Sequence, residues 1–404
     1  MEPLIIPESV KEISTDSAGN YGTQDITGTE SKVVYCKKCV ISNQRPRITF
    51  DDEGICSACR YAEKKENEID WDDREKQLID LLDHYRKNDG SYDCLVPVSG
   101  GKDSCFVAHQ LKFKYNMNPL LVTFAPLRWS TIGWQNLQSL IDTGFDTEIC
   151  VPNTYAYRLL SRLSTEYLGD PFQPFVYGVK AYPIRMALKH NISLIFYGEN
   201  GEVEYGGDMK NADSFMHDVG EDLRNHYFKG MMPSDWEKYG VDKKLLHSFS
   251  LPNPDQVQDK QIKCSWFSFF KKWTPQWNFY YAREHTGFEP EADGRSEGTY
   301  SKYASIDDKL DGFHYYLGFI KFGIGRATSD AAHEIRDGHI SREEGVALVK
   351  KYDGEFPKKN YDLFLQYMDM TDEQFQSIVD RFRPSPLWIK NNDEWQLKTQ
   401  VSNL

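Results

Sequence analysis

The sequence predicts an α/β protein built on a doubly wound parallel sheet, with a cysteine-containing unit before the sheet and a helical subdomain after it. Short apolar runs alternate with helix-compatible segments between residues 92 and 197, which is the pattern of parallel strands joined by crossover helices. The 404 residues exceed one average domain. Because 40% of them are hydrophobic and 14% aromatic, most of the chain is expected to be ordered.

Composition and periodicity divide the chain into five predicted parts. The first is rich in Ser, Thr and Gly and is expected to be a mobile arm, and the irregular fourth part is rich in aromatic residues and is expected to cover a substrate as a lid. The parts are the arm at 1–31, the cysteine unit at 32–68, the α/β domain at 69–204, the aromatic lid region at 205–300 and the helical subdomain at 301–404.

The elements of the α/β domain follow in order along the chain. An acidic helix is predicted from Ile69 to Arg86, because its leucines recur at helical spacing. The segment from Ser91 to Phe124 then predicts a strand, a glycine loop, a helix and a second strand. Helices at Gln135–Thr143 and Lys180–His190 each lead into another apolar run that predicts a strand.

The last part of the chain has helical periodicity. Ser341 and Glu344 stand in capping-box register at the start of one of its helices. Two short helices after Gly325 are compatible with a DNA-reading helix-turn-helix, but the acidic balance of the chain favours a packed helical subdomain.

Charge and hydropathy restrict the classes of partner. Lysine and arginine number 48 against 61 acidic residues, so the net charge is −13, which disfavours nonspecific binding of nucleic acid. No segment approaches the ~20 apolar residues of a membrane span, and the N-terminus lacks the features of a signal peptide. We therefore expect a soluble, cytoplasmic protein without a membrane span.

Four cysteines before the α/β domain have the spacing of a metal site. Cys36, Cys39, Cys56 and Cys59 form C-x2-C-x16-C-x2-C, in which each pair offers two thiolates to one tetrahedral ion. The alternative is four unrelated buried thiols. Four thiolates leave no open position on zinc, so the pattern predicts a structural Zn²⁺ without a catalytic role.

A glycine loop after the first predicted strand has the properties of a phosphate site. Glycines allow successive N–H groups to point outward, and the following helix N-terminus adds partial positive charge. The Walker pattern does not fit, because Asp103 follows Lys102. The alternative is a plain turn capped by Asp103. The predicted nucleotide-binding residues are Val98, Ser99, Gly100, Gly101, Lys102, Asp103 and Ser104.

The string SGGKDS after a strand resembles the loop of the PP-loop ATP pyrophosphatases, which cleave ATP between its α and β phosphates to adenylate a carbonyl oxygen. This resemblance implies that ATP binds with Mg²⁺ and that adenine lies against Thr123 and Phe124 at the end of the second strand. Gly198 and Glu199, at a later strand end, would form a further nucleotide-side motif. Ordinary strand exits are the alternative at both points.

Three features together resemble the N-acetyl sugar amidotransferases of bacterial lipopolysaccharide O-antigen and flagellin-sugar pathways. They are the four-cysteine unit, the segment WTPQWNFYYAREHTGFEP and the long string from SIDDKLDGFHYY to HISREE, and the resemblance runs from about Tyr35 to about Pro357. It implies that ATP adenylates the acetamido oxygen of a nucleotide sugar and that ammonia replaces this oxygen, giving an acetamidino sugar, AMP and pyrophosphate.

The resemblance also suggests roles for individual side chains. Lys102 and Asp103 would act on the phosphates with Mg²⁺, and Glu199 would position the acetamide or the ammonia. Lys321 and Arg326 would form a second cationic clamp, with surface charges beside a glycine turn as the alternative. The weaker candidates for substrate contacts are Asp307, Asp308 and Lys263. A helix cap explains the first two of these residues equally well.

The source of ammonia is predicted to be a separate glutaminase. Residue 2 is Glu, where an N-terminal-nucleophile glutaminase needs Cys, and the cysteines outside the four-cysteine unit lack a nucleophile pattern. In this family the partner resembles the histidine-pathway glutaminase and synthase pair.

Two other functions remain open from the sequence. A tRNA-modifying PP-loop enzyme of the thiolation or lysidine type also carries CxxC pairs, but it favours a basic groove and a cysteine pair after the loop, which this chain lacks. A zinc-ribbon interaction module with a degenerate nucleotide domain would need a damaged loop, whereas SGGKDS is intact.

Overall fold

A six-stranded, mostly parallel sheet forms the centre of the computed structural model, which describes residues 1–12, 32–210, 212–220 and 223–403. The strand order is β3-β2-β1-β4-β6-β5, and only the edge strand β5 runs antiparallel to its neighbour. The predicted doubly wound α/β fold is confirmed. The strands are β1 (Cys94–Pro97), β2 (Pro119–Phe124), β3 (Thr147–Cys150), β4 (Leu194–Tyr197), β5 (His217–Asp218) and β6 (Lys263–Trp266).

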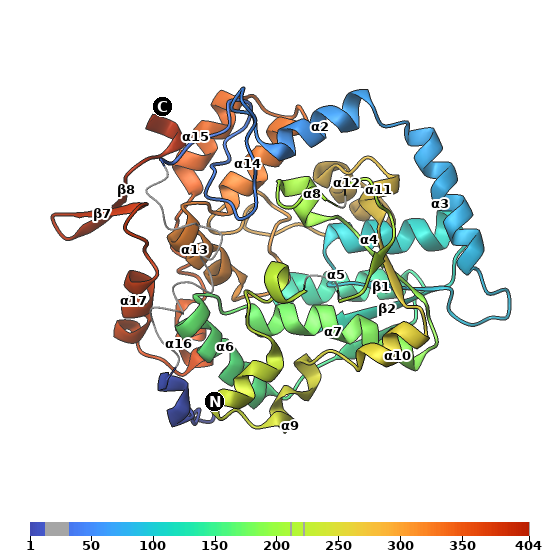
Figure 1. Cartoon of the computed structure of the whole chain (residues 1–404), viewed down its shortest axis with the longest axis horizontal. Coiled ribbons are helices and arrows are strands. Elements are labelled where there is room, and N and C mark those ends of the chain that lie inside the picture. Colours follow the sequence, from blue (N-terminus) through green and yellow to red (C-terminus); the bar gives the residue numbers. More distant parts are fainter. Residues whose placement is uncertain (13–31, 211, 221–222, 404) are drawn as a thin grey trace.

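Helices cover both faces of this sheet. Neighbouring strand residues alternate between two hydrophobic cores, as a pleated strand buried on both faces requires. Leu95 and Val122 pack with one set of helices, whereas Val96 and Leu121 pack with the other. Figure 1 shows α4 and α7 on opposite sides of the strands. The covering helices are α6 (Thr154–Leu168) and α7 (Gln173–Lys189) on one face, and α3 (Trp71–Tyr85), α4 (Lys102–His109), α5 (Thr131–Asp142) and α12 (Pro275–Thr286) on the other.

The aromatic region that was expected to form a lid contributes instead to the sheet and its core. Strand β6 pairs in parallel with β4, so the sheet extends beyond the predicted boundary at residue 204. Phe267, Trp273 and Phe279 are completely buried, and α12 packs along α4. Burial of these large apolar surfaces explains the aromatic excess. The region begins at the end of α8 (Gly201–Tyr205) and also contains α9 (Lys243–Leu246), α10 (Pro254–Asp259) and α11 (Phe267–Phe270).

The C-terminal part is helical, as predicted, but it also contains a hairpin that the sequence did not reveal. Ser341 and Glu344 form the expected capping box. The hairpin turns at Asn392 and Asp393, whose φ values of 48° and 65° suit these two residue types. The elements are α13 (Asp311–Phe322), α14 (Arg326–Arg336), α15 (Arg342–Tyr352), α16 (Tyr361–Met368), α17 (Asp372–Arg381), β7 (Trp388–Asn391) and β8 (Glu394–Leu397).

The start of the chain packs against the protein body, in contrast to the mobile arm expected there. A short turn of helix spans Glu8–Glu12, and Val10 is completely buried in the core beneath it. The backbone N–H of Leu4 donates to the carboxylate of Asp369 at 2.8 Å. The rest of the expected arm, residues 13–31, lies outside the described residues.

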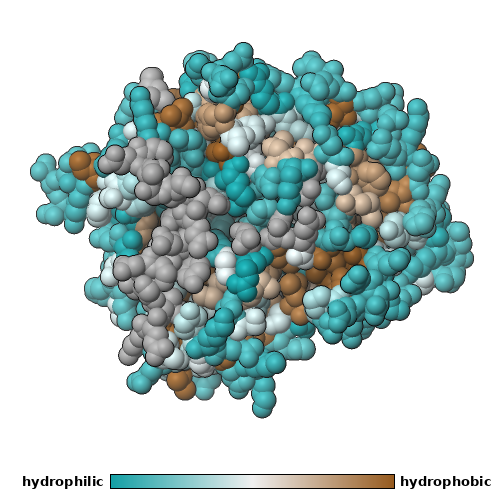
Figure 2. All heavy atoms as spheres, viewed as in Figure 1, coloured by the Kyte–Doolittle hydropathy of each residue, from teal (hydrophilic) through white to brown (hydrophobic). Residues whose placement is uncertain are grey.

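None of the helices within the described ranges combines the length and the apolar character that a membrane span needs. Hydrophilic residues cover most of the molecular face seen in Figure 2.

The four-cysteine unit, which ends in α2 (Ser57–Asn67), is held to both later parts of the chain. Its cysteines share a buried cluster with Ala331 and Ala332 of α14. Lys65 of α2 forms a buried ion pair with Glu204 of α8, with 2.7 Å between Nζ and Oε2. Because α8 follows directly after β4, the unit fixes the chain where this strand leaves the sheet.

We predict that Lys65→Met destabilises the protein by about 3–5 kcal/mol, because Glu204 would remain buried without its cation. Urea unfolding measures this loss. The matched control is Lys64→Met, which removes the exposed Lys64–Asp213 pair and should cost below about 1 kcal/mol. Equal losses for both variants would show that the buried pair does not hold α2 to α8.

Candidate functional site

The loop between β1 and α4 is pressed against the backbone of α5. Gly100 has a φ of +82°, and a Cβ at this position would lie 2.7 Å from the backbone nitrogen of Leu137. Both the left-handed conformation and the close approach require glycine. The loop therefore has a fixed path that a side chain at residue 100 would disturb.

The loop leaves the N-terminus of α4 open to an anion. Gly101 is the N-cap residue and offers no side-chain cap to the first helical N–H groups. Ser104 donates from its hydroxyl to the Gly101 carbonyl at 2.9 Å, and Ser99 accepts from the Gly101 N–H at 3.3 Å. Uncapped N–H groups and the helix dipole together attract negative charge here.

Lys102 supplies the full positive charge at this helix end. Its side chain is buried, and its Nζ lies 2.5 Å from Oδ2 of Asp103 and 5.0 Å from the centre of the Tyr303 ring. The other Asp103 oxygen accepts a hydrogen bond of 2.9 Å from the amide of Asn278, on α12. The ammonium is thus held close to the loop by an aspartate that is itself held in place.

Glu199 follows β4 and lies on the side of the loop opposite to α5. Its Oε1 accepts a hydrogen bond of 3.3 Å from the Tyr205 hydroxyl, whereas its Oε2 is buried with no hydrogen-bond partner among the described residues. Burial and the negative charge of Asp103 raise the pKa of Glu199 to about 7, against the opposing effect of Lys102. A carboxyl with this pKa can take up or release a proton near neutral pH.

The C-terminal part of the chain lies beside the loop at Asp307. A Cβ at Gly133 of α5 would lie 2.4 Å from the Asp307 Cα, so the two segments are in direct backbone contact. Burial raises the pKa of Asp307 to about 6, while a hydrogen bond with Ser99 and the charge of Arg326 oppose the rise. Asp307 and Arg326 therefore belong to the surroundings of the loop.

Arg326 is held in place at the start of α14. Its Nη1 donates to the Tyr315 hydroxyl at 2.6 Å, and its Nε lies 3.1 Å from a carboxylate oxygen of Asp330. The guanidinium also lines a cavity of about 610 Å³ between α5 and the C-terminal part. It can therefore reach a ligand that enters this cavity.

Four residues predicted for the site have structural roles. The Thr123 hydroxyl donates to the Val98 carbonyl at 2.8 Å, and the Phe124 ring packs on Gly178, so both side chains point into the protein and leave only backbone for a nucleotide. The buried Asp308 carboxylate accepts from three backbone N–H groups, those of Leu127, Arg128 and Leu310. Gly198 packs beside Trp273, where a Cβ would approach the indole to 3.0 Å.

Two predicted cations do not reach the loop. Lys321 is 2% exposed, and its Nζ donates to the Leu168 carbonyl at 3.1 Å, in the contact between α13 and α6. Burial lowers its pKa to about 7. Lys263 begins β6, so it lies at the amino edge of the parallel sheet, opposite to the loop, where it pairs with Asp218. The predicted clamp is thus reduced to Arg326.

Sequence reasoning missed the side chains that line the loop from distant segments. Asn278 and Trp273 lie in the string that carried the family resemblance, but no spacing rule connects them to the loop. Tyr205 and Tyr303 likewise belong to segments without a motif. Packing of α12 on α4 and of the C-terminal part on α5 brings Trp273, Asn278 and Tyr303 to the site, whereas Tyr205 reaches Glu199 from the end of α8.

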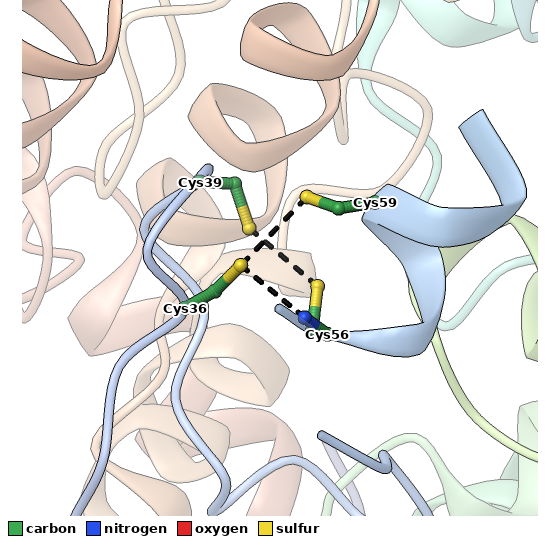
Figure 3. A group of neighbouring side chains, drawn as sticks. All are labelled: Cys36, Cys39, Cys56 and Cys59. Atoms are coloured by element: carbon green, nitrogen blue, oxygen red, sulfur yellow. Dashed lines mark hydrogen bonds between the residues drawn. The ribbon is translucent and has the colours of Figure 1, made fainter. Parts of the chain in front are cut away.

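The four cysteines of the N-terminal unit converge as predicted (Figure 3). The Sγ–Sγ distances are 3.8 Å for Cys36–Cys59 and for Cys39–Cys56, and all four sulfur atoms lie within 4.8 Å of one another. Tetrahedral bonds of about 2.3 Å from sulfur to zinc would separate neighbouring sulfur atoms by about 3.8 Å. The donor set and its geometry therefore fit one tetrahedral ion.

Three of the four remaining cysteines, Cys94, Cys105 and Cys150, have surroundings that make them unreactive thiols. Cys94 and Cys105 are completely buried, and burial raises the pKa of both, in Cys105 to about 12. Burial also raises the pKa of Cys150. A raised pKa suppresses the nucleophilic thiolate at neutral pH.

Comparisons with known proteins give one family match in the C-terminal part and one short match to a curated protein. The family described as LPS biosynthesis protein WbpG-like, C-terminal domain, matches residues 297–402. An uncharacterized protein of Methanocaldococcus jannaschii is 31% identical over 88 residues, which are 22% of this chain and 31% of that relative. The match thus spans less than a third of the relative.

Three solved structures were also found to be similar at low overall agreement. NMN synthetase of Francisella tularensis has 15% identity and a TM-score of 0.27, covering 56% of this chain and 90% of that one. The U34-tRNA thiolase NcsA of Methanococcus maripaludis, solved with its [4Fe-4S] cluster, has 14% identity and a TM-score of 0.29, and the match covers 76% of this chain and 88% of that one. NAD+ synthetase of Burkholderia pseudomallei has 12% identity and a TM-score of 0.26, and the match covers 58% of this chain and 98% of that one.

Similarity at TM-scores this low does not establish a shared fold. The fold assignment therefore rests on the sheet order and on the β1–loop–α4 unit described above. The C-terminal match concerns the part of the chain that supplies Asp307 and Arg326 to the loop. Residues 297–402 therefore match the family model for the C-terminal domain of WbpG-like LPS biosynthesis proteins, and they follow an α/β domain whose β1–α4 loop carries the string SGGKDS.

Proposed function

We propose that the protein is an ATP-dependent amidotransferase that converts the acetamido group of a nucleotide sugar into an acetamidino group for surface polysaccharide synthesis. The observation that carries this proposal is the SGGKDS loop, with its uncapped helix N-terminus and the buried ammonium of Lys102. The match to a WbpG-like LPS biosynthesis family and the resemblance to N-acetyl sugar amidotransferases support the choice of substrate.

The loop would bind the phosphates of ATP. The N–H groups of α4 and the hydroxyl of Ser104 would surround the β and γ phosphates, and Lys102 would offset the charge that develops as pyrophosphate leaves. The acetamido oxygen attacks the α phosphorus, so one P–O bond forms as another breaks. Ammonia then attacks the imidoyl carbon, and AMP departs with the former amide oxygen.

Glu199 would handle the proton of the incoming nitrogen. Its free Oε2 and its pKa of about 7 suit a base that accepts one proton as the new C–N bond forms. Arg326 would contact an anionic part of the substrate from the cavity beside α5.

Two metals fit the donor groups. Asp103, with ATP phosphates, would hold Mg²⁺, which offsets phosphate charge. Cys36, Cys39, Cys56 and Cys59 would hold a structural Zn²⁺. That ion would stabilise the unit from which Lys65 reaches Glu204 of α8.

Ammonia would come from a separate glutaminase subunit, because the thiols outside the four-cysteine cluster show no activated nucleophile. None of the eight cysteines takes part in a disulfide, which suits the reducing cytoplasm. If the purified chain alone hydrolysed glutamine, the proposed division of labour would be wrong.

A tRNA-modifying activity is the second candidate, favoured by the four-cysteine cluster and opposed by the net charge of −13. One assay separates the two. The protein is incubated with ATP, Mg²⁺ and ammonium, and with either acetamido uronic-acid nucleotide sugars or tRNA. We expect AMP and pyrophosphate with a sugar whose product is lighter by about one mass unit, as replacement of oxygen by NH requires. AMP released only with tRNA would refute the sugar reaction.

Lys102→Met should abolish AMP formation, by at least about 10³-fold, because one fixed cation opposite the phosphates contributes several kcal/mol to such a transition state. Zinc content and melting temperature should stay close to those of the parent. Lys112→Met, one helix turn beyond α4 and exposed, is the control and should retain activity. Activity of Lys102→Met within tenfold of the parent would exclude the assigned role.

Cys39→Ser should lose the metal and lower the melting temperature, because one of four ligands is replaced by a weak donor. The effect on the metal site should exceed any effect on the SGGKDS loop. Metal analysis of the purified protein measures this, with Cys150→Ser as the control outside the cluster. Full zinc content and unchanged stability in Cys39→Ser would discredit a four-thiolate site.

Glu199→Gln should make stability less dependent on pH. The folded pKa of Glu199, about 7, exceeds its ordinary value of 4.5, so the folded state binds the proton more tightly and stability falls as pH rises from about 4.5 to 7. Glutamine, which stays neutral, removes this loss. Urea unfolding should show that the free energy of unfolding of the variant, relative to that of the parent, is higher at pH 8 than at pH 5. A parallel pH dependence in both proteins would contradict the assigned pKa.

A further inference from the structure

A second polar pocket lies beside the segment that carries Glu199. It has a volume of about 80 Å³ and is walled by α7, by the carboxyl ends of β4 and β6 and by residues between 208 and 227. The pocket is lined by Tyr197 and Asn200. The two residues between them face the other way, Gly198 toward Trp273 and Glu199 toward Asp103. The pocket and the loop thus lie on two sides of one short segment.

Lys180 of α7 projects its amine into a cage of aromatic rings in this pocket. Its Nζ lies 3.8 Å from the ring centre of Tyr227, 4.9 Å from that of Tyr197 and 5.5 Å from that of Trp266. All three distances fall within the range of cation–π attraction. Burial lowers the pKa of Lys180 to about 8, so most of the amine still carries its charge at neutral pH.

Each carboxylate that lines the pocket already has a cation of its own. Glu202 forms an ion pair of 2.6 Å with Arg47. Asp218 pairs with Lys263 at 2.5 Å. Asp208 lies 4.0 Å from Lys210 and 3.9 Å from His226. Across the part of the chain that the structure describes, neither a hydrogen bond nor an ion pair connects any of them to Lys180.

Lys180 is therefore a desolvated cation that is paired with none of the described carboxylates of the pocket. Aromatic rings offset only part of the cost of burying an ammonium ion. An oxyanion in the pocket would supply a counter-charge to this ammonium. A volume of about 80 Å³ accommodates a group of the size of a carboxylate or a phosphate.

We propose that Lys180 and its aromatic cage form the subsite for one oxyanion group of the nucleotide-sugar substrate. The remainder of the substrate would extend past Asn200 toward Glu199, which would bring the acetamido group to the loop. This inference rests on the proposed function for the identity of the substrate. Its chemistry, an oxyanion in a cationic aromatic pocket, rests on the pocket itself.

The oxyanion could be a uronate carboxylate or a phosphate of the nucleotide, and one binding experiment separates these sources. Calorimetry without ATP or ammonium measures the dissociation constants of UDP-N-acetylglucosaminuronic acid and of UDP-N-acetylglucosamine, which differ in the carboxylate. Lys180→Met should weaken binding of the uronate alone, by at least tenfold, if the subsite holds the carboxylate. It should weaken both equally if the subsite holds a phosphate.

The controls keep the result independent of folding and of catalysis. Lys180→Arg should bind within a few fold of the parent, because it keeps the charge. Lys189→Met, at an exposed position of the same helix, should bind as the parent does. Wild-type protein that binds neither nucleotide sugar, or Lys180→Met that binds both as well as the parent, would overturn the subsite. AMP assays on the same samples report separately on the proposed reaction.

Discussion

The charge balance around Lys102 is the constraint on which the candidate site depends. Asp103, Glu199 and Asp307 all lie near the loop, and burial raises the pKa of the last two. The Lys102 ammonium, held between Asp103 and the Tyr303 ring, offsets this negative charge together with Arg326. Phosphate oxygens arriving at α4 would compete with Asp103 for the same ammonium, and Asp103 would then be available to a divalent cation.

The position of Glu199 depends on parts of the chain that come before and after the sheet. Lys65 holds α8 through Glu204, and Arg47 holds it through Glu202. Arg342 of α15 donates to the Cys39 carbonyl at 3.2 Å, so the C-terminal part supports the cysteine unit in turn. A structural metal in this unit would thus influence catalysis through the rigidity of α8, without contact with substrate.

The sequence predicted those features whose residues are close together along the chain. SGGKDS and the paired cysteines specify their geometry locally, and both occur as expected. Lys321 failed as a clamp because a nearby glycine turn does not tell which way a helical side chain points, and here it points into α6. Strand β6 was missed because four residues within an irregular aromatic region show no period, although parallel pairing with β4 defines them clearly in space.

Transfer of oxygen from the acetamido group to AMP is the most direct test of the account. A nucleotide sugar labelled with ¹⁸O in its acetamido oxygen is converted with ATP and ammonium, and the AMP is analysed by mass spectrometry. If the loop supports adenylation of the amide oxygen, each AMP formed with an acetamidino product carries one ¹⁸O. Unlabelled AMP, or ADP in its place, would contradict cleavage between the α and β phosphates by that oxygen.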